Sequence, residues 1–418
     1  MVRRYEVAEK PSDDGVDDLE DLHKAFEKDS YHVVPYSRKR VLRYYMDDEM
    51  EENDEAEGVK GEEEYNERTV ARTTTRKRNR MKNTQAVIEP DTHDDGDSVL
   101  TQDAISSTAS LTASILEYRT IHGRTFHSQR GPGNAQYWAP NDDQHNTSMD
   151  IQHHVWTLLL DGKLHLVPLP EQVGKVLDVG TGTGIWAIDF ADENPEAIVV
   201  GVDLSPTQPG WVPPNCRFEI DDVSLRWTRP ENEFDFVHLR TMFGSFKDWQ
   251  HVFNEAYRVC KPGGYVEDFE ASSDLISDDG TVTRDNGTAL GQWGKLFHEA
   301  GWKTGRSMAI FEEDTQIKCM KEAGFVEIVV KDIKCPLGQW PKDPRQKEIG
   351  SYDQAAVEEG LEGYVVYMLT DILGWSMDEV QLYLSKVRKE LRDKKHHTYF
   401  WTRTVYGRKP AVRETSGP

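Results

Sequence analysis

The sequence predicts an α/β fold in which a mainly parallel sheet is covered by helices on both faces. Three observations support this prediction. Short runs rich in β-branched residues alternate with helical stretches over about residues 170–340, a Gly-rich turn joins the first run to its helix, and acidic residues close successive runs. Alternation of this kind is typical of parallel strands joined by helical crossovers.

The folded part is expected to begin near residue 110, where apolar residues start to recur at helical spacing. Two helices are expected first, over Ala113–His122 and Asp150–Leu160, with Asp150 able to cap the second. The core elements then follow in chain order: strand 175–179, helix 185–194, strands 198–202, 217–220 and 234–239, helix 249–259, strand 264–270, helix 315–323 and strand 324–333. A helical insert at about 343–394 and a last strand at about 397–406 complete a domain spanning 110–418.

Residues 1–109 are expected to form a disordered, charged tail. Asp47–Glu67 contains twelve acids and one lysine, whereas Arg68–Lys82 contains seven bases and no acid. Blocks of like charge repel themselves and bury little apolar surface. Between them and the N-terminus, Tyr31–Met46 mixes aromatic and basic residues, which is consistent with a partner-docking segment or with an extended arm. The basic run at 76–82 has the composition of a nuclear import signal and predicts a nuclear as well as a cytoplasmic location.

Composition excludes several classes of function. The 418-residue chain has a formal net charge of −24, which argues against direct nucleic-acid binding because such binding depends on cationic side chains. No run of 18 apolar residues is present, so no transmembrane segment is expected. The cysteines include no CxxC pair and predict neither a disulfide framework nor a metal site; they are Cys216, Cys260, Cys319 and Cys335.

The segment VLDVGTGTG, Val176–Gly184, carries the most information about function. A buried strand ends at Asp178, and the glycines that follow let backbone N–H groups approach a ligand closely. A dinucleotide fingerprint needs GxGxxG, but here Ile185 stands where its third glycine would fall. The observed GxGxG spacing after an acid-ending strand is typical of enzymes that use S-adenosylmethionine.

The next two strands also end in acids. Asp203 closes VVGVD, where a carboxylate can accept hydrogen bonds from both ribose hydroxyls. Asp222 and Val223 follow the third strand, where the acid suits an exocyclic amine of adenine and the aliphatic side chain suits the ring face. Asp221 competes for the first of these roles, and Asp222 is preferred because it directly precedes the small apolar residue. Each acid alone is typical of a turn or helix cap, but three in order favour a cofactor site.

These segments resemble a known family. Val176–Glu270, with FDFVHLR and EAYRVCKPGGYVEDFE, resembles the class I S-adenosylmethionine-dependent methyltransferases. The flanking segments DIQHHVWTLLLDGKLHL, LRTMFGSFKDW and PLGQWPKDPRQKEIG resemble a narrower group, the fungal LaeA-like methyltransferases, which regulate secondary metabolism and development. The resemblance covers about residues 114–410 and implies a Rossmann-like sheet of seven strands.

The resemblance and the motifs together imply S-adenosylmethionine as cofactor. Tyr118 is also expected at the cofactor, because the first predicted helix could close over it. The expected cofactor-binding residues are Tyr118, Asp178, Gly180, Thr181, Gly182, Gly184, Asp203, Leu204, Asp222 and Val223.

Catalytic residues are less clearly indicated. His238 and Arg240 end the fourth strand on the expected substrate side, and His238 is interpreted either as a base or as a histidine that packs under the cofactor. Arg240 is interpreted either as a ligand for a substrate carboxylate or as the partner of an acid such as Asp248. The resemblance also implies a protein partner, a velvet-type regulator or another methyltransferase. A chain that binds the cofactor but works mainly as a regulatory scaffold is the alternative function.

Overall fold

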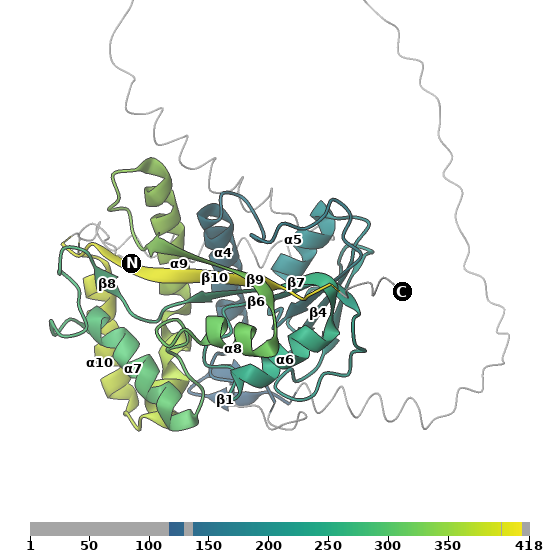
Figure 1. Cartoon of the computed structure of the whole chain (residues 1–418). Helices are drawn as coiled ribbons and strands as arrows, with labels where there is room; N and C mark the ends of the chain where they lie inside the picture. The colour runs from purple at the N-terminus through teal and green to yellow at the C-terminus, as the bar shows by residue number, and fades with distance from the viewer. Residues whose placement is uncertain (1–116, 129–136, 394, 412–418) are drawn as a thin grey trace, which may run out of the picture. The chain divides into compact units, whose positions relative to one another are not determined.

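The computed structural model describes residues 117–128, 137–393 and 395–411, and these residues are drawn in colour in Figure 1. All of them belong to one structural unit. The predicted tail at 1–109, with its docking segment and its basic run, lies outside the described residues.

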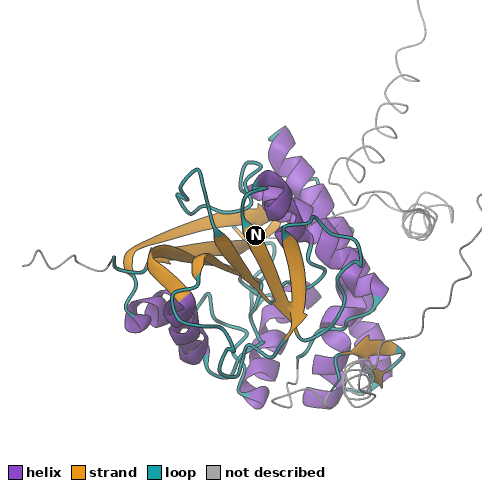
Figure 2. Cartoon of the chain, turned by 90° about the vertical axis from the view of Figure 1, so that its right-hand side faces the viewer, coloured by secondary structure: helices purple, strands orange, loops and turns teal. Residues whose placement is uncertain are grey.

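One sheet of eight strands forms the centre of the described region. Figure 2, in which strands are orange, shows it with helices packed around it. Its order is β5-β4-β3-β6-β7-β10, with β9 paired to the other edge of β10 and the short β8 paired to the start of β10. The strands are β3 (Lys175–Val179), β4 (Ile198–Asp203), β5 (Cys216–Ile220), β6 (Phe234–Arg240), β7 (Cys260–Ala271), β8 (Ile276–Ser277), β9 (Val326–Pro336) and β10 (Thr398–Arg408). The predicted Rossmann-like sheet is confirmed, with β8 as an additional short strand.

The topology of the sheet reverses beside β3. Strands β3, β4 and β5 are parallel neighbours, and β6 pairs in parallel with the other side of β3. The chain therefore moves outward from β3 to β5 and returns on the opposite side. In open parallel sheets such a reversal leaves a crevice at the carboxyl ends of the strands, where ligands bind.

Helices cover both faces of this sheet because the side chains of β3 alternate between them. Leu177 and Val179 pack in one cluster with α6 (Trp249–Val259) and α8 (Thr315–Ala323). Val176 points to the opposite face and packs in another cluster with α5 (Ile185–Glu193). The helices predicted at 185–194, 249–259 and 315–323 are thus present, and the sheet is closed on both sides.

A third cluster joins four helices to the β7–β10 side of the sheet. It contains Trp156 of α4, Trp293 of α7, Leu361 of α9 and Leu384 of α10, packed with Phe269 of β7. The helices are α4 (Asp143–Leu159), α7 (Ala289–Thr304), α9 (Pro344–Tyr367), followed directly by the π-turn η1 (Met368–Ile372), and α10 (Met377–Leu391). In Figure 1, α7 and α10 lie beside each other near β8.

The predicted helix over Ala113–His122 is wrong where the structure describes it. Residues Arg119–Ile121 form β1 and residues Arg124–Phe126 form β2, paired as an antiparallel hairpin. The two residues between them, His122 and Gly123, have φ values of 48° and 84°. Positive φ at both positions is the signature of a type I′ hairpin turn. The His-Gly pair is the sequence signal for this turn.

The second predicted helix begins earlier than expected. Helix α4 starts at Asp143 rather than Asp150, and Asp142 caps it by accepting a hydrogen bond from the His145 backbone N–H at 3.0 Å. The first two turns, DQHNTSM, carry few apolar residues, so the hydrophobic period became visible only from Ile151. The additional turns carry His145 and Met149, which line the functional site.

Two further differences from the sequence-based prediction concern helices of the cluster that contains α7, α9 and α10. No element was predicted over α7, whose three glycines, Gly291, Gly294 and Gly301, obscure its helical pattern. The insert expected at 343–394 is present but is interrupted after η1, where Gly374 adopts a φ of 77°. Ser376 and Glu379 then form a capping box that starts α10.

Three carboxyl groups lie in the buried part of β7. Glu267 accepts hydrogen bonds from the backbone N–H groups of Leu166 and Val167, at 2.8 and 3.1 Å. Glu270 accepts from those of Met242 and Phe243, at 2.6 and 3.1 Å. Burial raises the pKa of Glu267 to about 8, and it also raises the pKa values of Asp268 and Glu270, which interact with each other. Glu267 and Glu270 thus hold two loops against the sheet, and burial disfavours the ionised form of all three carboxyl groups.

The free energy of unfolding should therefore fall as pH rises from about 6.5 to 8. In this window the folded chain keeps protons on Glu267 and Asp268 that the unfolded chain has already released, so deprotonation favours unfolding by up to about 1.4 kcal/mol per pH unit and group. The buried histidines His145 and His238, with pKa values lowered to about 4, act in the opposite sense and mainly below this window. Urea titrations at several pH values should show the slope, and Glu267→Gln should flatten it. An unchanged slope in that variant would contradict the assignment.

Candidate active site

A cavity of about 110 Å³ lies at the carboxyl ends of β3 to β6, where the sheet topology reverses. Seven residues expected from the sequence line it: Gly180, Gly182, Asp203, Leu204, Asp222, Val223 and Arg240. The remaining expected residues do not line it: Tyr118, Asp178, Thr181, Gly184 and His238. Seven of the twelve expected residues therefore come together around one cavity, and the other five lie outside its wall.

The Gly-rich turn adopts a conformation that side chains would disturb. Gly180 and Gly182 have φ values of 70° and 58°, in the left-handed region that favours glycine. A Cβ atom on Gly180 would overlap the Sδ of Met242. A Cβ on Gly182 would lie 3.4 Å from the Sδ of Met149, on the wall of the cavity. The turn thus leaves its backbone open to a ligand.

Asp203 is fixed by the same turn. Its Oδ2 accepts a hydrogen bond from the Gly182 N–H at 2.8 Å, and its Oδ1 accepts from the Ser205 N–H at 3.0 Å. Burial raises the pKa of Asp203 to about 6, against the effect of these N–H donors. The carboxylate is mostly ionised at pH 7 and lies on the cavity wall, where it can accept hydrogen bonds from a ribose.

Asp222 presents an oxygen that the described residues leave without a hydrogen-bond partner. Its Oδ1 accepts from the backbone N–H and the hydroxyl of Ser224, at 2.9 and 2.6 Å, whereas its Oδ2 is buried and unpartnered. An unpaired buried carboxylate oxygen is costly, and an amine donor in the cavity would satisfy it. The neighbouring Asp221 instead uses Oδ1 to accept from the Asp222 N–H at 2.9 Å. This geometry favours Asp222 over Asp221 as an adenine ligand.

His238 and Asp178 form a buried pair behind the cavity. The His238 Nδ1 lies 2.7 Å from Asp178 Oδ1, and the Thr181 hydroxyl donates to Asp178 Oδ2 at 2.5 Å. The His238 ring stacks on Trp186 with centroids 3.6 Å apart and an interplanar angle of 5°. His238 is 1% exposed and burial lowers its pKa to about 4. Of the two interpretations of His238, this geometry favours the packing role over that of a base, and Asp178 and Thr181 stabilise the turn from behind.

Arg240 does line the cavity, but it does not pair with Asp248 as one interpretation expected. Its Nη2 donates to His153 Nδ1 at 3.1 Å, and His153 Nε2 lies 3.0 Å from Asp189 Oδ2. Asp248 instead caps α6 by accepting from the His251 N–H. Although burial lowers the pKa of Arg240 to about 10, it remains cationic at neutral pH. A fixed cation at this edge suits a carboxylate ligand.

Several residues of the cavity are not among those predicted from the sequence. They come from the segment before α4, from the early turns of α4 and from the turn after β6: Tyr137, His145, Met149 and Thr241. The capping motif at Asp142 was the signal that could have revealed His145 and Met149. Thr241 has a φ of 54°, which is unusual for a β-branched residue and often marks a functional site.

A second cavity of about 150 Å³ adjoins the first. The two share four wall residues, Tyr137, His145, Met149 and Thr241. The walls of the second cavity come mainly from the cluster of α4, α7, α9 and α10 and are largely apolar and aromatic. The described region thus contains two adjoining cavities of different chemistry that share part of their walls.

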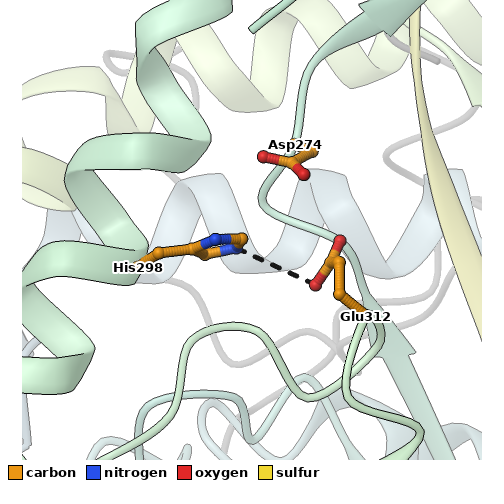
Figure 3. Close-up of side chains that lie close together, drawn as sticks. All are labelled: Asp274, His298 and Glu312. Atoms are coloured by element: carbon orange, nitrogen blue, oxygen red, sulfur yellow. Dashed lines mark ion pairs between the residues drawn. The ribbon is translucent and has the colours of Figure 1, made fainter.

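One group of three side chains has the spacing of metal ligands. Asp274, His298 and Glu312 point toward one another in Figure 3, and each offers an atom within 4.8 Å of the others. However, Arg284 donates to Asp274 Oδ1 at 2.8 Å and to His298 Nδ1 at 2.5 Å. Because the guanidinium already supplies a positive charge to these atoms, the group is an ion-pair network and we assign no metal to it.

Comparison with known proteins decides the family. Residues 151–329 match a family described as a methyltransferase domain. Methyltransferase pytC of Aspergillus terreus is 38% identical over 309 residues, which cover 74% of this chain and 93% of that protein. The secondary metabolism regulator LAE1 of Cochliobolus heterostrophus is 35% identical over 67% of this chain and 92% of that protein. The chain belongs to the LaeA-like methyltransferase family. It is an enzyme of the methyltransferase class, and its cofactor is S-adenosylmethionine.

Two further matches are less similar in sequence. The protein-methionine methyltransferase laeA of Emericella nidulans is 31% identical over 70% of this chain and 77% of that protein. A solved phosphoethanolamine N-methyltransferase of Haemonchus contortus is 20% identical over 63% of this chain and 52% of that chain, with a TM-score of 0.36.

Among the helices of the described residues, none is both long and apolar enough to cross a lipid bilayer.

Asp222 and its neighbour Asp221 should contribute differently to the affinity for the cofactor. Asp222→Ala removes the unpartnered buried acceptor and is expected to weaken binding of S-adenosylhomocysteine, the demethylated cofactor, by about tenfold, or ~1.4 kcal/mol. Asp221→Ala should change affinity by less than about twofold, because its carboxylate is used within the turn. Titration calorimetry of both variants measures the difference. An equal or larger loss in Asp221→Ala would reverse the assignment.

Proposed function

We propose that this chain is an S-adenosylmethionine-dependent methyltransferase that acts in fungal secondary metabolism or development, with a protein residue or a small molecule as acceptor. The observation that carries the proposal is the pair of adjoining cavities. The first has the unpartnered Asp222 oxygen on its wall, and the second, of about 150 Å³ and here called the apolar chamber, has a mainly apolar wall. The secondary metabolism regulators among its relatives support the biological setting.

The residues of the first cavity suit the parts of the cofactor. Asp203 would accept from the ribose and Asp222 from the adenine amine, while Gly180 and Gly182 leave room beside the backbone. Arg240 is suited to the carboxylate of the amino-acid part because it is a buried cation on the cavity wall. When bound, the cofactor supplies a methyl group activated by its sulfonium. The chain itself contributes orientation and the exclusion of water, which can account for much of the rate.

Transfer can be tested with the full-length protein. The purified chain is incubated with methyl-labelled S-adenosylmethionine and a fungal cell extract, and products are identified by mass spectrometry. A labelled product that is absent with Gly182→Val supports the proposal. Cofactor binding without any labelled product would favour the regulatory scaffold instead.

We also propose that the enzyme works with a protein partner, a velvet-type regulator or another methyltransferase, in the nucleus and cytoplasm. The support comes from sequence: the aromatic and basic segment Tyr31–Met46 has the residue types enriched at interface cores, and the basic run at 76–82 resembles an import signal. Deleting residues 31–46 should abolish co-purification of the partner and leave cofactor affinity unchanged. Recovery of the same partners without the segment would remove this role.

A further inference from the structure

We propose that the apolar chamber binds the methyl acceptor, a small molecule with one aromatic or similarly sized ring that carries a hydroxyl group, and that His145 receives the proton of that hydroxyl. This inference rests on the proposed methyltransferase function and specifies its acceptor. The chamber is the cavity of about 150 Å³, and none of the residues expected to bind the cofactor lines it. Its position beside the cofactor cavity gives it access to the reacting methyl group.

The size and lining of the chamber favour a compact apolar ligand. Trp156, Trp293, Phe297 and Phe400 contribute aromatic side chains to its wall, and each is buried. Its volume of about 150 Å³ equals that of an engineered apolar cavity known to bind benzene. One ring therefore fits, and aromatic walls suit its faces and edges.

The same lining disfavours a polypeptide acceptor that would bury its backbone in the chamber. A peptide carries an N–H and a C=O on almost every residue, and each would need a partner once buried. The polar groups of the chamber are mostly engaged within the protein. The Ser273 hydroxyl donates to the Met308 carbonyl, the Tyr364 hydroxyl lies 2.8 Å from the Ser148 hydroxyl, and Gln152 donates to Asp353.

One face of helix α4 lines both cavities. His145 and Met149, one turn apart, line both cavities, and Gln152 and Trp156 continue the same face along the chamber. Spacings of four, three and four residues place these side chains in one row. The reacting oxygen of an acceptor that fills the chamber would therefore lie near His145, at the junction.

His145 is suited to receive the proton. Its side chain is 3% exposed, and its Nδ1 has no hydrogen-bond partner in the described parts of the chain. Its ring meets Tyr364 edge-on, and the charged groups that act on it are Asp142 and Arg124. Burial lowers its pKa to about 4, so the ring is neutral at pH 7 and can accept a hydrogen bond. Tyr137, which also lines both cavities, has a pKa raised by burial and by Asp203, so its hydroxyl remains a donor.

The proton balance is simple. The acceptor oxygen forms a bond to the methyl carbon as the carbon–sulfur bond breaks and its electron pair returns to sulfur. The hydroxyl O–H bond breaks, and its proton moves to a ring nitrogen of His145 and then to solvent. A base of low pKa suffices because the hydroxyl becomes strongly acidic as its oxygen is alkylated. The products are a methyl ether, the neutral thioether cofactor and one proton.

Binding of 4-methylphenol to the full-length chain tests the proposal. With saturating S-adenosylhomocysteine, titration should show saturable binding at millimolar or lower concentrations, and 4-methylphenol should bind more tightly than toluene. Val357→Phe narrows the chamber and should weaken 4-methylphenol binding by at least about tenfold, with the affinity for S-adenosylhomocysteine unchanged. The control Leu382→Phe, at an exposed position of α10 outside the chamber, should alter neither affinity. His145→Phe should keep toluene binding and remove the preference for 4-methylphenol.

The outcomes separate this proposal from the function on which it rests. A chain that binds S-adenosylhomocysteine but not 4-methylphenol overturns the chamber assignment, and so does label transfer confined to methionine-containing peptides. Equal binding of 4-methylphenol and toluene by the native chain overturns the role of His145. Failure to bind S-adenosylhomocysteine would count against the methyltransferase function itself.

Discussion

Gly182→Val is expected to lower the affinity for S-adenosylhomocysteine by at least about a hundredfold, or ~2.8 kcal/mol. Gly182 has a φ of 58°, which a β-branched side chain rarely adopts. Its Cβ would already contact Met149 across the cavity at 3.4 Å, so the two added methyl groups would occupy cofactor space. Calorimetry with S-adenosylhomocysteine measures the loss.

The matched variant Gly182→Ala distinguishes cofactor exclusion from misfolding. Its single methyl group fits beside Met149 at ordinary contact distance, so an intermediate loss of affinity is expected. Both variants should keep the circular dichroism spectrum of the native chain. A folded Gly182→Val variant that binds the cofactor normally would show that the Gly-rich turn does not border the cofactor.

Trp186→Ala should lower the free energy of unfolding by about 3–5 kcal/mol. Trp186 is 1% exposed, stacks on His238 and donates its Nε1–H to the Leu164 carbonyl at 2.8 Å. Its removal leaves a cavity behind the Gly-rich turn, an unpaired carbonyl and a histidine without its stacking partner. Denaturant titration followed by circular dichroism measures the change.

Trp302→Ala supplies the control for this prediction. Trp302 belongs to α7 and is 82% exposed, so its replacement should change the unfolding free energy by no more than about 0.5 kcal/mol. Equal destabilisation by the two substitutions would show that the packing between α5 and the sheet has been misjudged.

The cofactor half of the site could be predicted because its signals are local. Gly182, Asp203 and Asp222 each stand at or just after the end of a strand, and parallel strands bring their carboxyl ends to one edge. Only local sequence order and the alternation of strands and helices were needed. Side-chain partners were harder to predict, since nothing in the sequence shows that His238 stacks on Trp186 and pairs with Asp178.

The acceptor half depends on contacts between distant segments and was largely missed. His145 becomes a site residue only because α4 begins at Asp143, in a polar stretch without a hydrophobic period. Trp293 belongs to α7, whose glycines conceal the helix although they let it pack closely against Asp274 and Thr283. Such packing appears only when the helices are assembled around the sheet.

Titration calorimetry of the native full-length chain with S-adenosylhomocysteine tests the central claim most directly. The paired anchors Asp203 and Asp222 beside the Gly-rich turn predict saturable binding of one molecule per chain, with a Kd of about micromolar order. The absence of both a binding heat and a shift in the thermal unfolding midpoint would contradict the account.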